Sequence, residues 1–131
     1  MRHALTAAVA RAMPHPLSPA AASYLDLLDR RLAAVAAIAE GSAEPRFKEE
    51  PKARALGRRF LRPLEGTWDD GDENLVRGYL DRWAPPGEDP ARETARRLTD
   101  AANALARLEA RPATFWCFLW QLESMLESLP T

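Results

Sequence analysis

Apolar residues recur along most of the chain at spacings of three and four, which is the period of a helix with one buried face. Ser18-Pro19 is typical of a helix start, because serine caps the first turn and proline is tolerated at the first helical position. Gly41 is typical of a helix end. We therefore predict a long helix between these signals, with an apolar stripe of Leu25, Leu28, Leu32, Val35 and Ala39.

Prolines and capping residues divide the remainder of the chain into five further predicted helices. Asp89-Pro90 repeats the cap-then-proline start, and Asp70 with Glu73 is expected to form a capping box. Pro85-Pro86-Gly87 should end the helix that follows this box. No stretch shows the strict alternation of a strand. The five helices are expected over about 3–13, 51–62, 71–83, 90–111 and 113–129.

The last of these helices contains the densest apolar run, Phe115 to Trp120. On a helix, its broadest apolar stripe should form the centre of the core. Trp116 and Trp120 lie roughly 100–140° round from Phe115, on a line that continues through two acids. Those tryptophans either fill a gap under a neighbouring helix or dock a partner protein, since tryptophan is enriched at interface hot spots. The stripe predicted to be buried is Phe115, Phe118, Leu119, Leu122, Met125, Leu126 and Leu129.

Together these elements predict an all-α fold, an antiparallel helical bundle of three long helices with about three shorter helices. The second, fifth and sixth helices are the long ones. The chain has 131 residues, of which 47% are hydrophobic, so it can close a core without disulfides or metals. We expect residues 1–131 to be a single helical domain, in which the N-terminal helix and proline-rich connection of 1–17 could lie at the periphery.

Charge is nearly balanced, with 18 basic and 19 acidic residues and a net charge of -1, so only local clusters can indicate a partner. The strongest cluster is an arginine line on the third predicted helix. Like charges one turn apart repel each other, so something should neutralise the line. The acidic segment at 69–73, a partner's carboxylates, or nucleic-acid phosphates could do so. The line consists of Arg54, Arg58 and Arg62, with Arg59 beside it.

Residues that carry catalysis or bind metals are sparse. Cys117 is the single cysteine and lies within the apolar run, so we expect it to be structural. His3 and His15 are not in metal-ligand spacing with other likely ligands. The acidic segment matches a calcium loop poorly, because Leu75 occupies the place of the turn glycine. No nucleotide-binding or hydrolase motif is present. We therefore favour a function without catalysis, cofactor or metal.

Our first hypothesis is a non-catalytic protein-interaction module of a bacterial cytoplasm, an accessory or regulatory subunit whose partner is a second copy or another protein. No apolar run approaches the roughly 20 residues that span a bilayer, so no membrane partner is expected. The docking surface would consist of Trp116, Trp120, Glu123 and Glu127.

Two alternatives stay open. The chain could be a small helical subunit of a nucleoprotein assembly, with arginines on the phosphates. It could also bind a small molecule between its helices, in an apolar cavity near Trp83 and Trp120. The phosphate contacts would come from Arg54, Arg58, Arg59 and Arg62.

Overall fold

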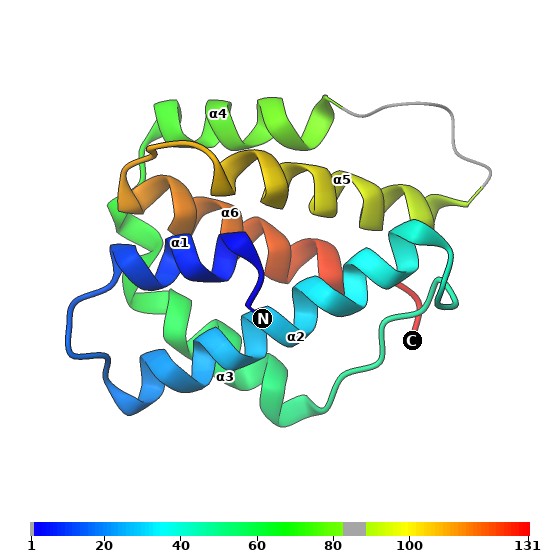
Figure 1. The fold of residues 1–131 in the computed structure, drawn as a ribbon, viewed down its shortest axis with the longest axis horizontal. Helices are drawn as coiled ribbons and strands as arrows, with labels where there is room; N and C mark the ends of the chain where they lie inside the picture. Colours follow the sequence, from blue (N-terminus) through cyan, green and yellow to red (C-terminus); the bar gives the residue numbers. More distant parts are fainter. Residues whose placement is uncertain (1, 83–88) are drawn as a thin grey trace.

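The computed structural model describes residues 2–82 and 89–131, and these residues form an all-α fold (Figure 1). The three longest helices are α2, α5 and α6, as the apolar pattern predicts. A 3₁₀ helix, η1 (Arg62–Thr67), continues α3 into the segment between the predicted helices over 51–62 and 71–83. The helices of the described residues are α1 (Ala4–Ala12), α2 (Pro19–Glu40), α3 (Pro51–Leu61), α4 (Asp70–Asp81), α5 (Pro90–Ala106) and α6 (Pro112–Glu127).

Local capping signals fix both ends of α2. The Ser18 hydroxyl accepts a hydrogen bond from the Ala21 amide at 3.1 Å, and Pro19 occupies the first turn. Gly41 takes the left-handed conformation, with φ 81°, which is costly for residues with a Cβ. Its amide hydrogen bonds to the carbonyl oxygens of Ala37 and Ile38. The predicted start and end of this helix are therefore confirmed.

Other boundaries differ from the prediction. The capping box of α4 is formed by Asp69 and Asp72, one residue before the expected pair of Asp70 and Glu73. Asp69 has extended backbone angles and its carboxylate accepts from the Asp72 amide, so it ends the preceding segment. Helix α5 ends at Ala106, before the expected stop at Arg111-Pro112. The expected break at 85–87 lies outside the described residues.

Within the described residues, α6 packs against every other helical element except α2. The most extensive helix pair is α2 with α5, which run in opposite directions side by side (Figure 1). Helix α6 packs against α4 on one side and against α3 and η1 on another. Helix α1 contacts α2, α5 and α6 and buries Leu5 and Val9 completely, so the N-terminal helix is part of the core.

The stripe predicted to be buried lies in the core except for Met125, which is half-buried; Leu129 is buried but lies beyond the end of α6. Phe118, Leu119 and Leu122 have no exposed surface, and Phe115 is also buried. Cys117 is buried among them, and burial raises the pKa of its thiol to about 11. The thiol is therefore protonated at neutral pH, which fits the structural role expected for it.

Candidate functional site

The four residues predicted to dock a partner divide between core and surface. Trp116 and Glu123 are 7% and 1% exposed, whereas Trp120 is half-buried and Glu127 is exposed. The cause is the packing of α3 and η1 against this side of α6. The expected line of tryptophans and acids is therefore not one open surface of the isolated chain. A docking role for Trp120 and Glu127 stays a prediction.

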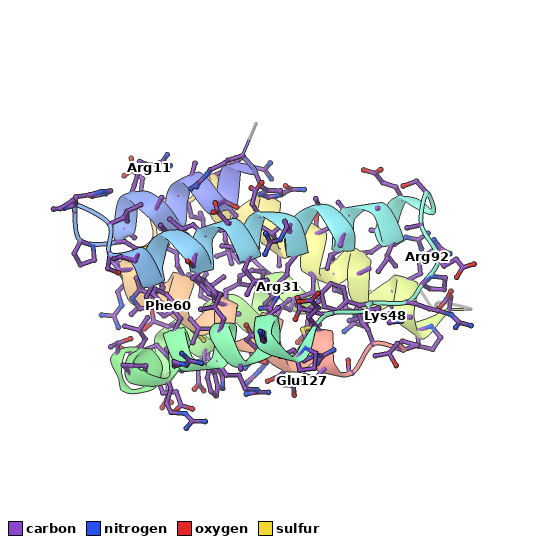
Figure 2. All side chains as sticks on the ribbon, turned by 90° about the horizontal axis from the view of Figure 1, so that it is seen from below. Arg11, Arg31, Lys48, Phe60, Arg92 and Glu127 are labelled. Atoms are coloured by element: carbon purple, nitrogen blue, oxygen red, sulfur yellow. The ribbon has the colours of Figure 1, made fainter. Side chains whose placement is uncertain are left out.

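Glu123 belongs to a buried ionic cluster with Arg31 of α2 and Glu49 of the connection before α3. Arg31 is 2% exposed, and its Nε and Nη2 donate to the two Glu49 carboxylate oxygens at 2.8 and 2.7 Å. Its Nη1 donates to Glu123. Figure 2 shows Arg31 in the interior between α2 and α3. One guanidinium thus joins α2, α6 and the connection before α3.

The charges of this cluster depend on one another. Burial raises the pKa of Glu123, and the nearby Glu49 carboxylate raises it further against the opposing effect of Arg31. Burial alone would lower the pKa of Arg31, but its bonds to both carboxylates outweigh burial and raise it. Arg31 therefore stays charged. Removing it would leave the buried Glu123 carboxylate and the part-buried Glu49 carboxylate without a cation, which is strongly unfavourable.

Gly57 of α3 makes room for the Glu123 carboxylate. A Cβ at position 57 would overlap the carboxylate and would lie 3.0 Å from Arg31 Nη1. Real Cβ atoms do not approach other atoms so closely without displacing them. Glycine weakens the interior of a helix, so its presence at position 57 needs a reason. The reason is the close packing of the Glu123 carboxylate against α3.

Arg58 belongs to the arginine line of α3 and contacts two residues of the docking surface predicted on α6. Its Nε and Nη2 donate to Glu127 at 2.8 and 2.5 Å. Its guanidinium also lies 5.4 Å from the Trp120 ring centroid, within cation–π range. Trp120 in turn lies 6.4 Å from the Trp68 ring, tilted by 42°. Helices α3 and α6 therefore present an arginine and a tryptophan on one continuous surface.

The rest of the arginine line faces outward. Arg58, Arg59 and Arg62 line an open hollow of about 590 Å³, with Ala55 and Pro63. Within residues 2–82 and 89–131, Arg54, Arg59 and Arg62 have no acidic partner within salt-bridge distance. The expectation that the following acidic segment folds back on the line is therefore wrong for these three side chains.

The acidic segment instead pairs with the start of α6. The Arg111 Nε and Nη2 donate to the Asp72 carboxylate at 3.1 and 2.6 Å, and the Thr114 hydroxyl donates at 2.7 Å. The bonds from Arg111 hold the pKa of Asp72 well below its ordinary value, against the opposing effect of burial. The carboxylate is thus already used for capping α4 and for joining α4 to α6.

An apolar hollow of about 300 Å³ lies next to the arginine hollow, and Pro63 lines both. Trp116 lines this hollow, together with residues of the connection between α1 and α2. The apolar cavity expected near Trp83 and Trp120 is not at this place, and Trp83 lies outside the described residues. The lining of the hollow includes Met13, Pro14, Pro16, Phe60, Leu64 and Trp116.

Two further hollows lie elsewhere in the described residues, one of about 470 Å³ beside Arg31, Lys48 and Glu49 and one of about 280 Å³ beside Arg77 and Arg97. In residues 2–82 and 89–131, no three or more His, Cys, Asp or Glu side chains gather closely enough to hold a metal ion. None of the described helices combines the length and apolar character needed to cross a membrane. Comparison of the chain with protein-family models, with curated proteins and with solved structures finds no match.

Proposed function

We propose that this chain is a non-catalytic interaction module, an accessory subunit that docks an acidic partner protein through the arginine face. The arginine face is Arg54, Arg58, Arg59 and Arg62, bordered by Trp120. The observation that carries the proposal is the hollow between Arg59 and Arg62. It is open, and neither arginine has an acidic partner in the described part of the chain.

The chemistry of the face favours carboxylates. Arginine presents a planar fork of donors that matches a carboxylate, and such paired bonds are stronger than neutral ones. Elsewhere in the described residues Arg111 makes this paired interaction with Asp72, and Arg97 donates a single hydrogen bond to Glu93. Arg58 donates two hydrogen bonds to one carboxylate oxygen of Glu127. Arg59 and Arg62 offer the same geometry to a partner.

Several features favour a protein over nucleic acid. Nucleic acid is bound through many phosphates over a long basic surface, and the chain has a net charge of -1. Trp120 is half-buried and covered by Arg58, so its ring face is not free to stack on a base. A short run of carboxylates requires neither a long basic surface nor a free ring face, since Arg59 and Arg62 alone could pair with it.

Site-specific photocrosslinking tests the proposal. A benzophenone amino acid replaces Arg59 in one variant and Arg107, on the exposed end of α5, in the control variant. Each is irradiated in extract of the source cells. The protein in any adduct specific to position 59 is then purified, and its dissociation constant is measured for the wild type and for Arg59→Ala/Arg62→Ala.

Our expectation is a protein adduct at position 59 that is absent at position 107, with binding at least about tenfold weaker for the double variant. An adduct sensitive to nuclease would favour the nucleoprotein alternative. Equal adducts at both positions, or binding that is unchanged in the double variant, would contradict a docking role for the arginine face.

A further inference from the structure

The two hollows on this side of the molecule form one composite surface. The arginine hollow and the apolar hollow share one lining residue, Pro63. Pro63 lies at the start of η1, and proline fixes its own backbone angle. Arg62 and Leu64 are its chain neighbours, so a cationic and an apolar lining residue flank it. A single ligand that crosses Pro63 would therefore contact both kinds of surface.

The walls of the apolar hollow are held by packing. Phe60 stacks on Tyr24, with ring centroids 4.5 Å apart and planes 13° apart. Met13 and Trp116 are buried at 4% and 7% exposure, so they form the floor. Pro14 and Pro16 are exposed and form the rim. The volume of the hollow, about 300 Å³, is at the lower end of the range for ligand pockets. It is large enough for one large apolar side chain.

We infer that the partner docks through an acidic segment that inserts one apolar anchor side chain into the apolar hollow and places carboxylates on Arg59 and Arg62. This inference rests on the proposed function and adds the chemistry of the partner. Buried anchors surrounded by charged contacts at the rim are the usual arrangement of a protein interface. Here Pro63 marks the boundary between the anchor hollow and the charged hollow.

Other anionic ligands match the composite surface less well. A phosphate backbone supplies charge to the arginines but no apolar side chain to the adjoining hollow. A fatty acid supplies an apolar chain but only one carboxylate for Arg58, Arg59 and Arg62. An acidic peptide segment supplies several carboxylates and an anchor at once, which is the charge and shape complementarity that the two hollows require.

Fluorescence anisotropy with a factorial set of labelled peptides of about ten residues tests this inference. One peptide combines a phenylalanine anchor with a block of glutamates. The others replace the phenylalanine by alanine, the glutamates by glutamines, or both. Each is titrated with the wild type, with Arg59→Ala/Arg62→Ala, with Leu64→Ser, and with the charge-matched control Arg46→Ala/Arg107→Ala. An oligothymidylate and dodecanoic acid serve as competitors.

We expect the phenylalanine-glutamate peptide to bind about tenfold or more tightly than each singly altered peptide. Arg59→Ala/Arg62→Ala and Leu64→Ser should each weaken its binding about fivefold or more, and the control should not. Circular dichroism checks that every variant is folded. The arginine variants should fold because Arg59 and Arg62 are exposed, and the part-buried Leu64 makes this check necessary for Leu64→Ser.

The outcomes separate this inference from the proposed function. Equal binding of the phenylalanine and alanine peptides, lost in Arg59→Ala/Arg62→Ala, would overturn the anchor and leave the acidic docking face standing. Binding that ignores Arg59 and Arg62, or no binding by any acidic peptide, would overturn both. Displacement by the oligothymidylate or by dodecanoic acid, at lower concentration than unlabelled peptide, would overturn the inference in favour of nucleic acid or of a lipid.

Discussion

Arg31 of α2 donates a hydrogen bond from Nη1 to the Glu123 carboxylate of α6, and both side chains are buried. Helices α2 and α6 have no close backbone contact in the described residues, so the arginine side chain spans the space between them. Glu123 and Trp116 are therefore both buried in the interior. Trp120 and Glu127 lie instead at the surface beside Arg58, where they border the arginine face.

Removing the cation of the ionic cluster should cost much more stability than neutralising one of its anions. Arg31→Met leaves Glu49 and Glu123 without a cation, and should lower the free energy of unfolding by about 3–5 kcal/mol. Glu123→Gln keeps the Arg31–Glu49 pair and an oxygen acceptor, so we expect a change below about 1 kcal/mol at neutral pH. Urea denaturation measures both. Equal losses in the two variants would mean that both carboxylates are needed.

The same variants test the pKa of Glu123. Burial raises this pKa above its ordinary value of 4.5, so the folded chain holds the proton more tightly than the unfolded chain does. That stabilisation is fully present below 4.5 and is lost as the pH rises through the folded pKa. Relative to Glu123→Gln, the wild type should therefore lose stability over this rise. A wild type that gains stability instead would show that the Arg31 pairing dominates.

Gly57 and Gly78 provide a matched pair of helix glycines. A Cβ at position 78 meets no atom within 4 Å, so Gly78→Ala should stabilise the fold by about 0.5–1 kcal/mol. Gly57→Ala should destabilise it by about 1–3 kcal/mol, because the new Cβ overlaps the Glu123 carboxylate. Thermal unfolding decides the sign. Stabilisation by both substitutions would contradict the close packing of α3 on Glu123.

Asp72 should support the fold in a pH-dependent way. Its bonds from Arg111 lower its pKa below the ordinary 3.8, so the stability it contributes is present above that pH and is lost as the pH falls through the folded pKa. Asp72→Asn should lower the unfolding free energy by about 1–3 kcal/mol at neutral pH. The difference from the wild type should shrink on acidification below 3.8.

The control for Asp72 is Asp70→Asn, in the exposed first turn of α4. It removes the same charge, and we expect a change of only about 0.3–1 kcal/mol from its interaction with the helix dipole. Chemical denaturation at several pH values measures both variants. Equal effects of the two substitutions would show that the charge, and not the bonds to Arg111 and Thr114, supports the fold.

The tryptophans of α6 should differ in their effect on stability. Trp116→Ala removes a buried ring and should lower the unfolding free energy by about 3–5 kcal/mol. Trp120→Ala removes a half-buried ring whose main polar contact is Arg58, and should cost about 1–2 kcal/mol. Urea denaturation of the two single variants measures the difference. Losses of equal size would place both rings in the same environment.

Features encoded by neighbouring residues could be predicted from the sequence. Ser18 and Gly41 delimit α2 by their own capping and backbone preferences. Phe118 and Leu122 are large apolar residues on one helical stripe, so their burial is expected whichever helix packs against them. The sequence could not predict which aspartate of the acidic segment caps α4. Asp69 and Asp70 are equivalent caps by composition, and only the observed fold assigns the cap to Asp69.

The candidate site was partly predictable. The four-residue steps from Arg54 to Arg62 identify an arginine line, but its availability depends on contacts made far along the chain. Asp72 pairs with Arg111, and Glu127 pairs with Arg58 alone. The burial of Glu123 had a signal in the sequence, because Arg31 lies on one helical line with Leu28 and Val35. A charge at such a position predicts a buried partner of opposite sign.

The arginine Nε–Hε signals of the labelled protein, followed by heteronuclear NMR during titration with poly-glutamate, test the arginine face most directly. Substitution of single arginines by lysine assigns the signals. We expect those of Arg59 and Arg62 to shift first and most, while those of Arg46 and Arg107, which are also exposed, change little. Shifts of equal size at all four exposed arginines would show general charge attraction and would contradict a specific docking surface on α3.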